Sequence, residues 1–210
     1  MKFSCMTRLP IEPPPEDLAE EKPWDIFAEW YQAAHEGGVK DPSAVCIATA
    51  TRCGAPSCRM VLLKEFNERG FVIYTNSLSR KGREMEMNPQ AALCFYWQEI
   101  GRQVRIEGHV SHVSDEDADA YFNSRPLKSR IGAWASQQSD PMKDRSVLMK
   151  RIAHYTAKWA TGNVERPPHW KGFRIVPDYF EFWGEGAFRI HDRDVYYLRE
   201  NDWYKAILQP

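Results

Sequence analysis

The feature that most constrains the fold is a series of short β-prone segments, separated by turn residues, from residue 44 to about residue 113. Gly54-Ala55-Pro56 follows the first segment, and Asn67-Glu68-Arg69-Gly70 is typical of a hairpin turn. Strand patterns return after the break at Pro167-Pro168. The expected strands are 44–51, 59–64, 71–75, 91–97, 103–113, 173–176, 180–183, 194–198 and 203–208.

Helical patterns occur in two blocks between these strands. Trp24, Phe27 and Tyr31 recur at helical spacing, and Gly37-Gly38 ends that helix. Short helices begin at Ser79 and at Ser114, and further helices are expected over 129–136 and 144–160. Sequential antiparallel strands with helices in two blocks predict a mainly β barrel or sandwich rather than a doubly wound sheet.

Composition and charge exclude several classes of protein. Hydrophobic residues make up 43% and charged residues 27%, as in an ordinary globular protein. The 28 basic and 29 acidic residues give a formal charge of -1, which argues against a nucleic-acid partner. The apolar runs, such as residues 60–63, are far shorter than a membrane span.

The first 22 residues differ from the rest of the chain. Proline-rich and acidic, they predict a flexible arm before a single domain over residues 23–210. They also lack the pattern of a signal or transit peptide. The five cysteines form no C-x-x-C pair, so reduced thiols and a cytoplasmic location are expected.

Three clusters of polar residues are candidates for chemistry. Ser79-Arg80-Lys81 at a helix start suits an anion, although a solvated helix turn explains it equally well. Tyr121, Arg125 and Ser129 are four residues apart and suit a phosphate monoester, whereas each alone reads as an ordinary structural residue. On a strand, Arg189, His191 and Arg193 would face one side and repel one another without an anion or an acceptor-rich ring.

Two phosphate-type sites suggest a phosphorylated cofactor and a phosphorylated substrate. No metal site is expected, because the histidines are scattered and His109 and His112 should face opposite sides of a strand.

Eight motifs in order give the sequence a specific resemblance to a known family. They are RMVLLK at 59–64, YTN at 74–76, SRKG at 79–82, RQVRIEG at 102–108, YFNSRP at 121–126, QQS at 137–139, EFW at 181–183 and RIHDR at 189–193. Together they resemble the pyridoxine (pyridoxamine) 5'-phosphate oxidases. The resemblance implies an antiparallel, Greek-key-like split β-barrel that forms a homodimer and binds FMN at the subunit interface.

The resemblance also implies a set of site residues. The residues that would surround FMN are Arg59, Met60, Val61, Leu62, Leu63, Lys64, Tyr74, Thr75, Arg80, Lys81, Gln103, Gln138, Ser139, Trp183 and Arg193. Those that would hold the substrate phosphate are Lys64, Tyr121, Arg125 and Ser129. Arg189 and His191 would contact the pyridine ring and act as the catalytic pair.

The implied reaction oxidises pyridoxine 5'-phosphate or pyridoxamine 5'-phosphate to pyridoxal 5'-phosphate, with O2 reduced to hydrogen peroxide. Asp41 matches an acidic position of the family near the active site, and Arg8 is a candidate lid residue in an arm that lacks the family's tyrosine. Two alternatives remain: a split-barrel flavoprotein oxidase for another substrate, such as the phenazine-pathway oxidases, and a non-catalytic protein that binds FMN or pyridoxal phosphate.

Overall fold

The computed structural model describes residues 17–160 and 162–210, which divide into two compact units. The first unit contains the described residues up to Pro42, together with Phe95–Ile106 and Asp178–Pro210. The second contains Ser43–Cys94 and Glu107–Pro177. Three strands run through both units: β6 (Gln90–Trp97), β7 (Arg102–His112) and β8 (Trp170–Gly184).

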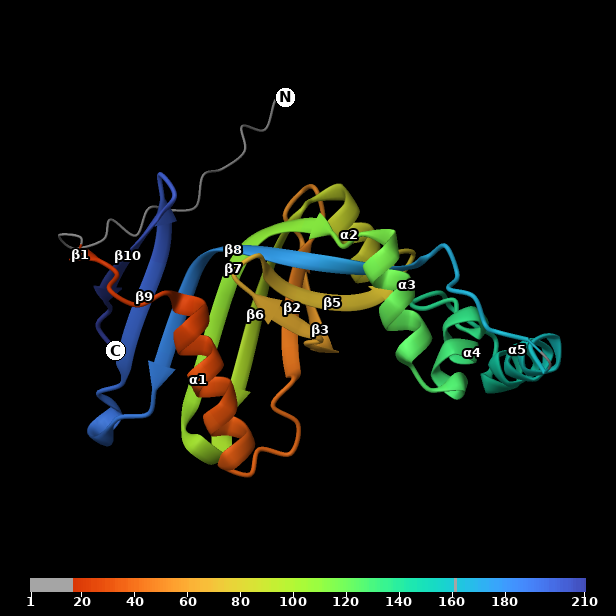
Figure 1. The fold of residues 1–210 in the computed structure, drawn as a ribbon, viewed down its shortest axis with the longest axis horizontal. Coiled ribbons are helices and arrows are strands. Elements are labelled where there is room, and N and C mark those ends of the chain that lie inside the picture. The colour runs from red at the N-terminus through yellow and green to blue at the C-terminus, as the bar shows by residue number, and fades with distance from the viewer. Residues whose placement is uncertain (1–16, 161) are drawn as a thin grey trace. The chain divides into compact units, whose positions relative to one another are not determined.

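The first unit is a β-hairpin, a helix and the strand segments that they contact. Strands β9 (Asp192–Arg199) and β10 (Asp202–Ile207) pair through a tight turn, and β9 also pairs with the second half of β8 (Figure 1). The two-residue strand β1 (Asp17–Leu18) pairs with β10. Helix α1 (Pro23–Glu36) buries Phe27, whose ring lies 5.1 Å from that of Phe95. A 3-10 turn, η1 (Gln98–Ile100), joins β6 to β7.

The second unit contains the remaining strands and most of the helices. Its strands are β2 (Ala44–Ala50), β3 (Pro56–Leu62), β4 (Glu65–Asn67) and β5 (Gly70–Asn76). Strand β2 pairs with β3 and β6, and β5 pairs with β4 and with the first half of β8, all antiparallel. Alternate residues of β2 are buried, which is the period of a half-buried strand. The helices are α2 (Arg80–Met87), α3 (Asp115–Ser124), α4 (Leu127–Ala135) and α5 (Arg145–Lys158); α3, α4 and α5 follow one another in Figure 1.

The predicted secondary structure is largely confirmed, with two corrections. First, residues 170–184 form one strand rather than two. Pro177 has no N–H to donate, but it lies between the residues that pair with β5 and those that pair with β9, so it interrupts neither ladder. Second, Arg189 and His191 do not share a strand with Arg193. Phe188 and Arg189 have positive φ angles of 57° and 63°, which bend the chain into the turn η2 (Ala187–Arg189) before β9 begins.

The remaining expectations about the N-terminal arm, including Arg8 and Cys5, concern residues outside the described part of the chain. A single domain over residues 23–210 stays a prediction. Within residues 17–160 and 162–210, no helix is long and apolar enough to cross a membrane.

Candidate active site

A buried lysine marks the start of helix α2 as a cationic site. Ser79 caps the helix by accepting the Gly82 N–H, and a Cβ on Gly82 would lie only 2.4 Å from the Ser77 carbonyl oxygen, so glycine is required there. Lys81 is only 8% exposed, and its Nζ donates to Gln138 Oε1 at 3.1 Å. Burial lowers the pKa of Lys81, and the nearby Arg59 lowers it further. A buried ammonium at the positive end of a helix suits an anionic ligand.

Two residues predicted to bind FMN contact this site although they are distant from α2 in the sequence. Gln138 Oε1 also accepts from Thr75 Oγ1 at 3.2 Å, and Ser139 Oγ accepts the Arg80 N–H at 3.1 Å. Thr75, Arg80, Lys81, Gln138 and Ser139 therefore lie together, as the resemblance implies.

A buried carboxylate connects the two arginines of the same site. Glu84 Oε1 accepts from Arg80 Nε at 2.9 Å, and Glu84 Oε2 lies 3.4 Å from Arg59 NH2. The same oxygen accepts from the hydroxyls of Thr49 at 2.5 Å and Ser57 at 2.6 Å. Burial alone would raise the pKa of Glu84, but the hydrogen bonds from Ser57, Thr49 and Arg80 outweigh it and hold the pKa at about 2.

A second cationic site has aromatic walls. The ring of Tyr74 stacks on Tyr121 at 4.4 Å and on Trp170 at 5.0 Å, and the Arg125 guanidinium lies 4.8 Å from the Trp170 ring centre. Burial lowers the pKa of Arg125. Its NH1 atom is buried, and no residue of the described chain hydrogen-bonds to it. A buried guanidinium nitrogen without an acceptor is costly, which favours an anionic ligand here.

The two sites are on opposite sides of strand β5. Successive residues of a strand face opposite sides, and Tyr74 contacts the aromatic site while Thr75 contacts Gln138 in the site at α2. One strand thus separates two cationic sites.

Other predicted residues of the second unit have fewer contacts. Lys64 is exposed just after β3 and Ser129 is exposed in the first turn of α4, so their side chains are accessible to a ligand. Met60 and Leu62 are 63% and 42% exposed on one face of β3, Val61 is half-buried, and Leu63 is buried.

The remaining predicted residues belong to the first unit. The Trp183 and His191 rings are 4.6 Å apart, and His191 Nδ1 accepts the Gly186 N–H at 3.3 Å. Gln103 is half-buried in β7, and Arg189 is exposed in η2. Arg193 donates to the buried Glu181 from Nε at 2.9 Å and from NH2 at 2.8 Å. The weaker candidate Asp41 is exposed.

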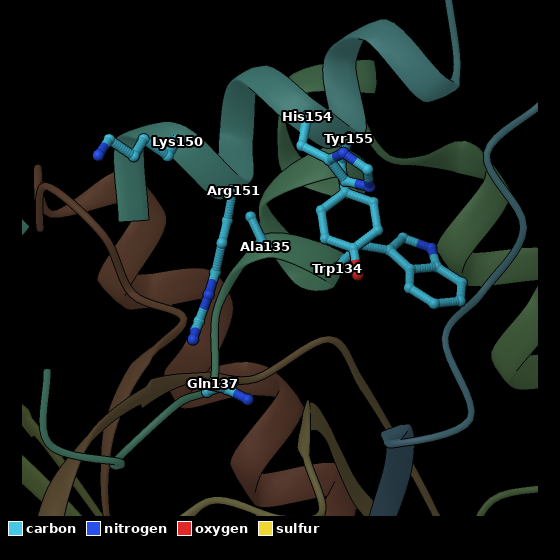
Figure 2. A pocket seen from close by; sticks show the side chains of 7 residues that line it. All are labelled: Trp134, Ala135, Gln137, Lys150, Arg151, His154 and Tyr155. Carbon is cyan, nitrogen blue, oxygen red and sulfur yellow. The ribbon is translucent and has the colours of Figure 1, made fainter. Parts of the chain in front are cut away.

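The second unit also contains two cavities. One of about 310 Å³ lies at helices α4 and α5 and is lined by Trp134, Ala135, Gln137, Lys150, Arg151, His154 and Tyr155 (Figure 2). Figure 2 shows Arg151 directed toward Gln137, which precedes the predicted FMN residues Gln138 and Ser139. The other, of about 600 Å³, is lined in part by Asp115, Asp119 and Arg166. Arg166 already forms ion pairs with both aspartates. Neither cavity contains a group of side chains that could hold a metal, and none occurs elsewhere among the described residues.

Sequence reasoning missed several residues of the sites, among them Glu84 and Trp170. Glu84 follows Arg80 by four residues on a helix, and this spacing alone could have predicted their ion pair. Trp170 forms a wall of the aromatic site from the first residue of β8, and no local sequence signal points to that role.

Solved structures define the class of fold. The structure of PhzG from Burkholderia lata 383, in complex with tetrahydrophenazine-1-carboxylic acid, matches with a TM-score of 0.86 and 33% identity, covering 90% of this chain and 93% of that one. A Nostoc punctiforme protein, described as a pyridoxamine 5'-phosphate oxidase-related, FMN binding protein, matches with a TM-score of 0.72 and 16% identity, covering 91% and 100%; at that identity it supports the fold alone. The chain has the split β-barrel fold, and the predicted fold class is confirmed.

Sequence comparisons define the family. A family model described as pyridoxamine 5'-phosphate oxidase matches residues 31–159, and one described as the pyridoxine 5'-phosphate oxidase C-terminal dimerisation region matches residues 170–210. The pyridoxine/pyridoxamine 5'-phosphate oxidase of Rhodospirillum rubrum is 50% identical over 198 residues, covering 92% of this chain and 98% of that protein. The chain belongs to the pyridoxine/pyridoxamine 5'-phosphate oxidase family.

Proposed function

We propose that this protein is an FMN-dependent oxidase that converts pyridoxine 5'-phosphate or pyridoxamine 5'-phosphate to pyridoxal 5'-phosphate and reduces O2 to hydrogen peroxide. Family membership supports this reaction, and so does the 50% identity to a relative of that name. The structural observation that carries the proposal is the buried NH1 of Arg125, which has no hydrogen-bond partner among the described residues and is separated by β5 from a distinct cationic site at α2. Two separate anion sites are what a phosphorylated cofactor and a phosphorylated substrate require.

The site at α2 fits the phosphate of FMN. Arg59, Arg80 and Lys81 supply positive charge at the positive end of the α2 dipole. When bound, FMN supplies the two-electron redox chemistry, while the protein supplies binding and orientation. The other FMN-surrounding residues named from the resemblance complete this assignment.

The aromatic site fits the phosphate of the substrate. Arg125 offers its free NH1, Tyr121 its hydroxyl beside the stacked rings, and the exposed Lys64 and Ser129 further donors. Fixing the phosphate fixes the position of the ring, because the ester group is short, and orientation contributes to rate.

Arg189 and His191 act on the substrate ring in this proposal. The Gly186 N–H donates to His191 Nδ1, which places the proton of the neutral imidazole on Nε2. The Nε2–H group of His191 is then the one that donates a hydrogen bond to the substrate ring. Arg189 is always protonated and planar, so it stabilises negative charge on the ring.

A second candidate function is oxidation of another ring substrate, as the likeness to PhzG suggests. A substrate without a phosphate would leave Arg125 NH1 without an acceptor in the aromatic site. The oxidation of a vitamin B6 phosphate is therefore the better-supported function.

The test is to purify the protein with FMN and add pyridoxine 5'-phosphate in air. The expected results are a yellow protein, formation of pyridoxal 5'-phosphate and an equal amount of peroxide. A protein that binds FMN and yields neither product would contradict the proposal.

Arg125→Ala separates the two sites. The loss of a charged hydrogen bond should raise the KM for pyridoxine 5'-phosphate about ten- to a hundredfold while FMN stays bound. Lys128→Ala, an exposed residue of the first turn of α4, is the matched control and should change neither. Loss of FMN from the Arg125→Ala variant would show that the two pockets have been assigned wrongly.

A homodimer and a cytoplasmic location complete the proposal. The match of residues 170–210 to a dimerisation region supports the dimer, and the exposed Met60 and Leu62 on one face of β3 are suitable for burial against a partner. The location rests on the cysteine pattern alone.

A further inference from the structure

A buried carboxylate that faces two phosphate-binding arginines needs an explanation, because it would repel the phosphate. Glu84 is 4% exposed and pairs with Arg80 and Arg59 in the site at α2. We propose that Glu84 is a positioning residue for the flavin phosphate: it fixes the orientation of the Arg59 charge, and it holds Arg80 so that the terminal N–H groups of Arg80 remain for the ligand. This inference rests on the proposed function.

Glu84 acts on Arg59 through two hydroxyl groups. A carboxylate can only accept hydrogen bonds, so the Thr49 and Ser57 hydroxyls must donate to it. Their oxygens then have lone pairs free for Arg59, whose NH1 donates to Thr49 at 2.6 Å and whose NH2 donates to Ser57 at 2.5 Å. An amide in place of the carboxylate could donate to the same hydroxyl oxygens and would compete with Arg59.

Glu84 acts on Arg80 directly. Glu84 accepts a hydrogen bond from Arg80 Nε at 2.9 Å, so the two terminal nitrogens of Arg80 remain for a ligand. The Arg80 side chain is 61% exposed. Such a side chain on the surface would otherwise sample many rotamers. Holding it at Nε reduces the entropy that a ligand must remove on binding.

The charge of the site also fits a phosphate monoester. Arg59, Arg80 and Lys81 contribute three positive charges and Glu84 one negative charge, which leaves two. A phosphate monoester carries a charge of about -1.5 to -2 at pH 7. Glu84 therefore reduces an excess of positive charge without removing the attraction.

The test compares FMN with riboflavin, which lacks the phosphate. Their dissociation constants for the apoprotein are measured by quenching of flavin fluorescence. Glu84→Gln should weaken FMN binding about tenfold and change riboflavin binding less than about twofold. Glu86→Gln removes an exposed charge from the same helix and should change neither.

Two outcomes would overturn the proposal. Equal losses for FMN and riboflavin would mean that Glu84 only maintains the fold, and unchanged or tighter FMN binding would mean that the carboxylate merely repels the phosphate. If Glu84→Gln does not fold, Ser57→Ala tests the proposal instead. It removes one acceptor of Arg59 from a half-buried position, and it should also weaken the binding of FMN but not that of riboflavin. Wild-type protein that fails to bind FMN would refute the proposed function itself, whereas wild-type oxidase activity combined with an unchanged variant would refute only the role of Glu84.

Discussion

Two buried glutamates, one in each unit, are each held by two arginines but differ in what those arginines can do. Glu84 in α2 binds Arg59 and Arg80, and Glu181 in β8 binds Arg105 at 2.7 Å and Arg193 at 2.8 Å. Both carboxylates are nearly inaccessible to solvent. The two clusters differ in how many guanidinium nitrogens lack a protein acceptor.

Around Glu181, Arg193 is engaged within the protein. Arg193 gives Nε and NH2 to Glu181 and NH1 to the Gln209 carbonyl, so each of its three nitrogens already has a protein acceptor. Around Glu84, by contrast, hydroxyls share the carboxylate, and Arg80 keeps both terminal nitrogens free. The same pairing therefore connects strands in one unit and leaves the terminal N–H groups of an exposed arginine available in the other.

The largest effect expected from this comparison is a dependence of stability on acid. The pKa of Glu84 is held at about 2 against an ordinary value of 4.5, so the folded state favours the carboxylate. Its contribution is complete above about pH 5 and is lost as the pH falls toward 2, a total of about 3 kcal/mol. Urea unfolding at pH 5 and pH 3 should show a steeper loss for wild type than for Glu84→Gln.

The control for this measurement is Glu86→Gln on the same helix, which should follow the wild-type pH dependence. Parallel pH dependences for wild type and Glu84→Gln would show that Glu84 is not held in its charged form by the network around it.

A smaller effect is expected from Glu181→Gln. The change removes the charged acceptor that Arg105 and Arg193 share, and the free energy of unfolding should fall by about 2 kcal/mol. The loss is smaller than for a fully buried pair because both arginines retain solvent contact. The ratio of FMN to riboflavin affinity should stay unchanged, unlike in Glu84→Gln. Glu185→Gln, an exposed neighbour, is the control. A selective loss of FMN affinity in Glu181→Gln would erase the distinction between the two clusters.

Most of the fold was predictable because its signals are local. The Ser79 cap, the stop after α1 and the turn before β5 depend on a few adjacent residues. The turn at Arg189 was not predictable, because an arginine with positive φ carries no local signal. Family and fold class followed from eight motifs in order, and the comparisons confirm both.

The site was predictable only in part. Charged residues such as Arg80, Lys81 and Arg125 were predicted as site residues because guanidinium and ammonium groups indicate an anion. Trp170 and Thr49 were missed because strand pairing brings them to the sites from distant parts of the sequence, and nothing near them indicates this. A residue that acts through another group is harder to find in a sequence than one that touches the ligand.

The smallest effect tests the relay between Glu84 and Arg59. Thr49→Val keeps the shape of a side chain that is 3% exposed and removes the hydroxyl that donates to Glu84 and accepts from Arg59. FMN binding should weaken only about threefold, because Arg59 keeps Ser57 as an acceptor, and riboflavin binding should be unaffected. In a double-mutant cycle, Thr49→Val should add little to Glu84→Gln, because the carboxylate that orients the hydroxyl is already absent. Fully additive losses would mean that Thr49 and Glu84 act on the flavin site independently, and the relay would have to be abandoned.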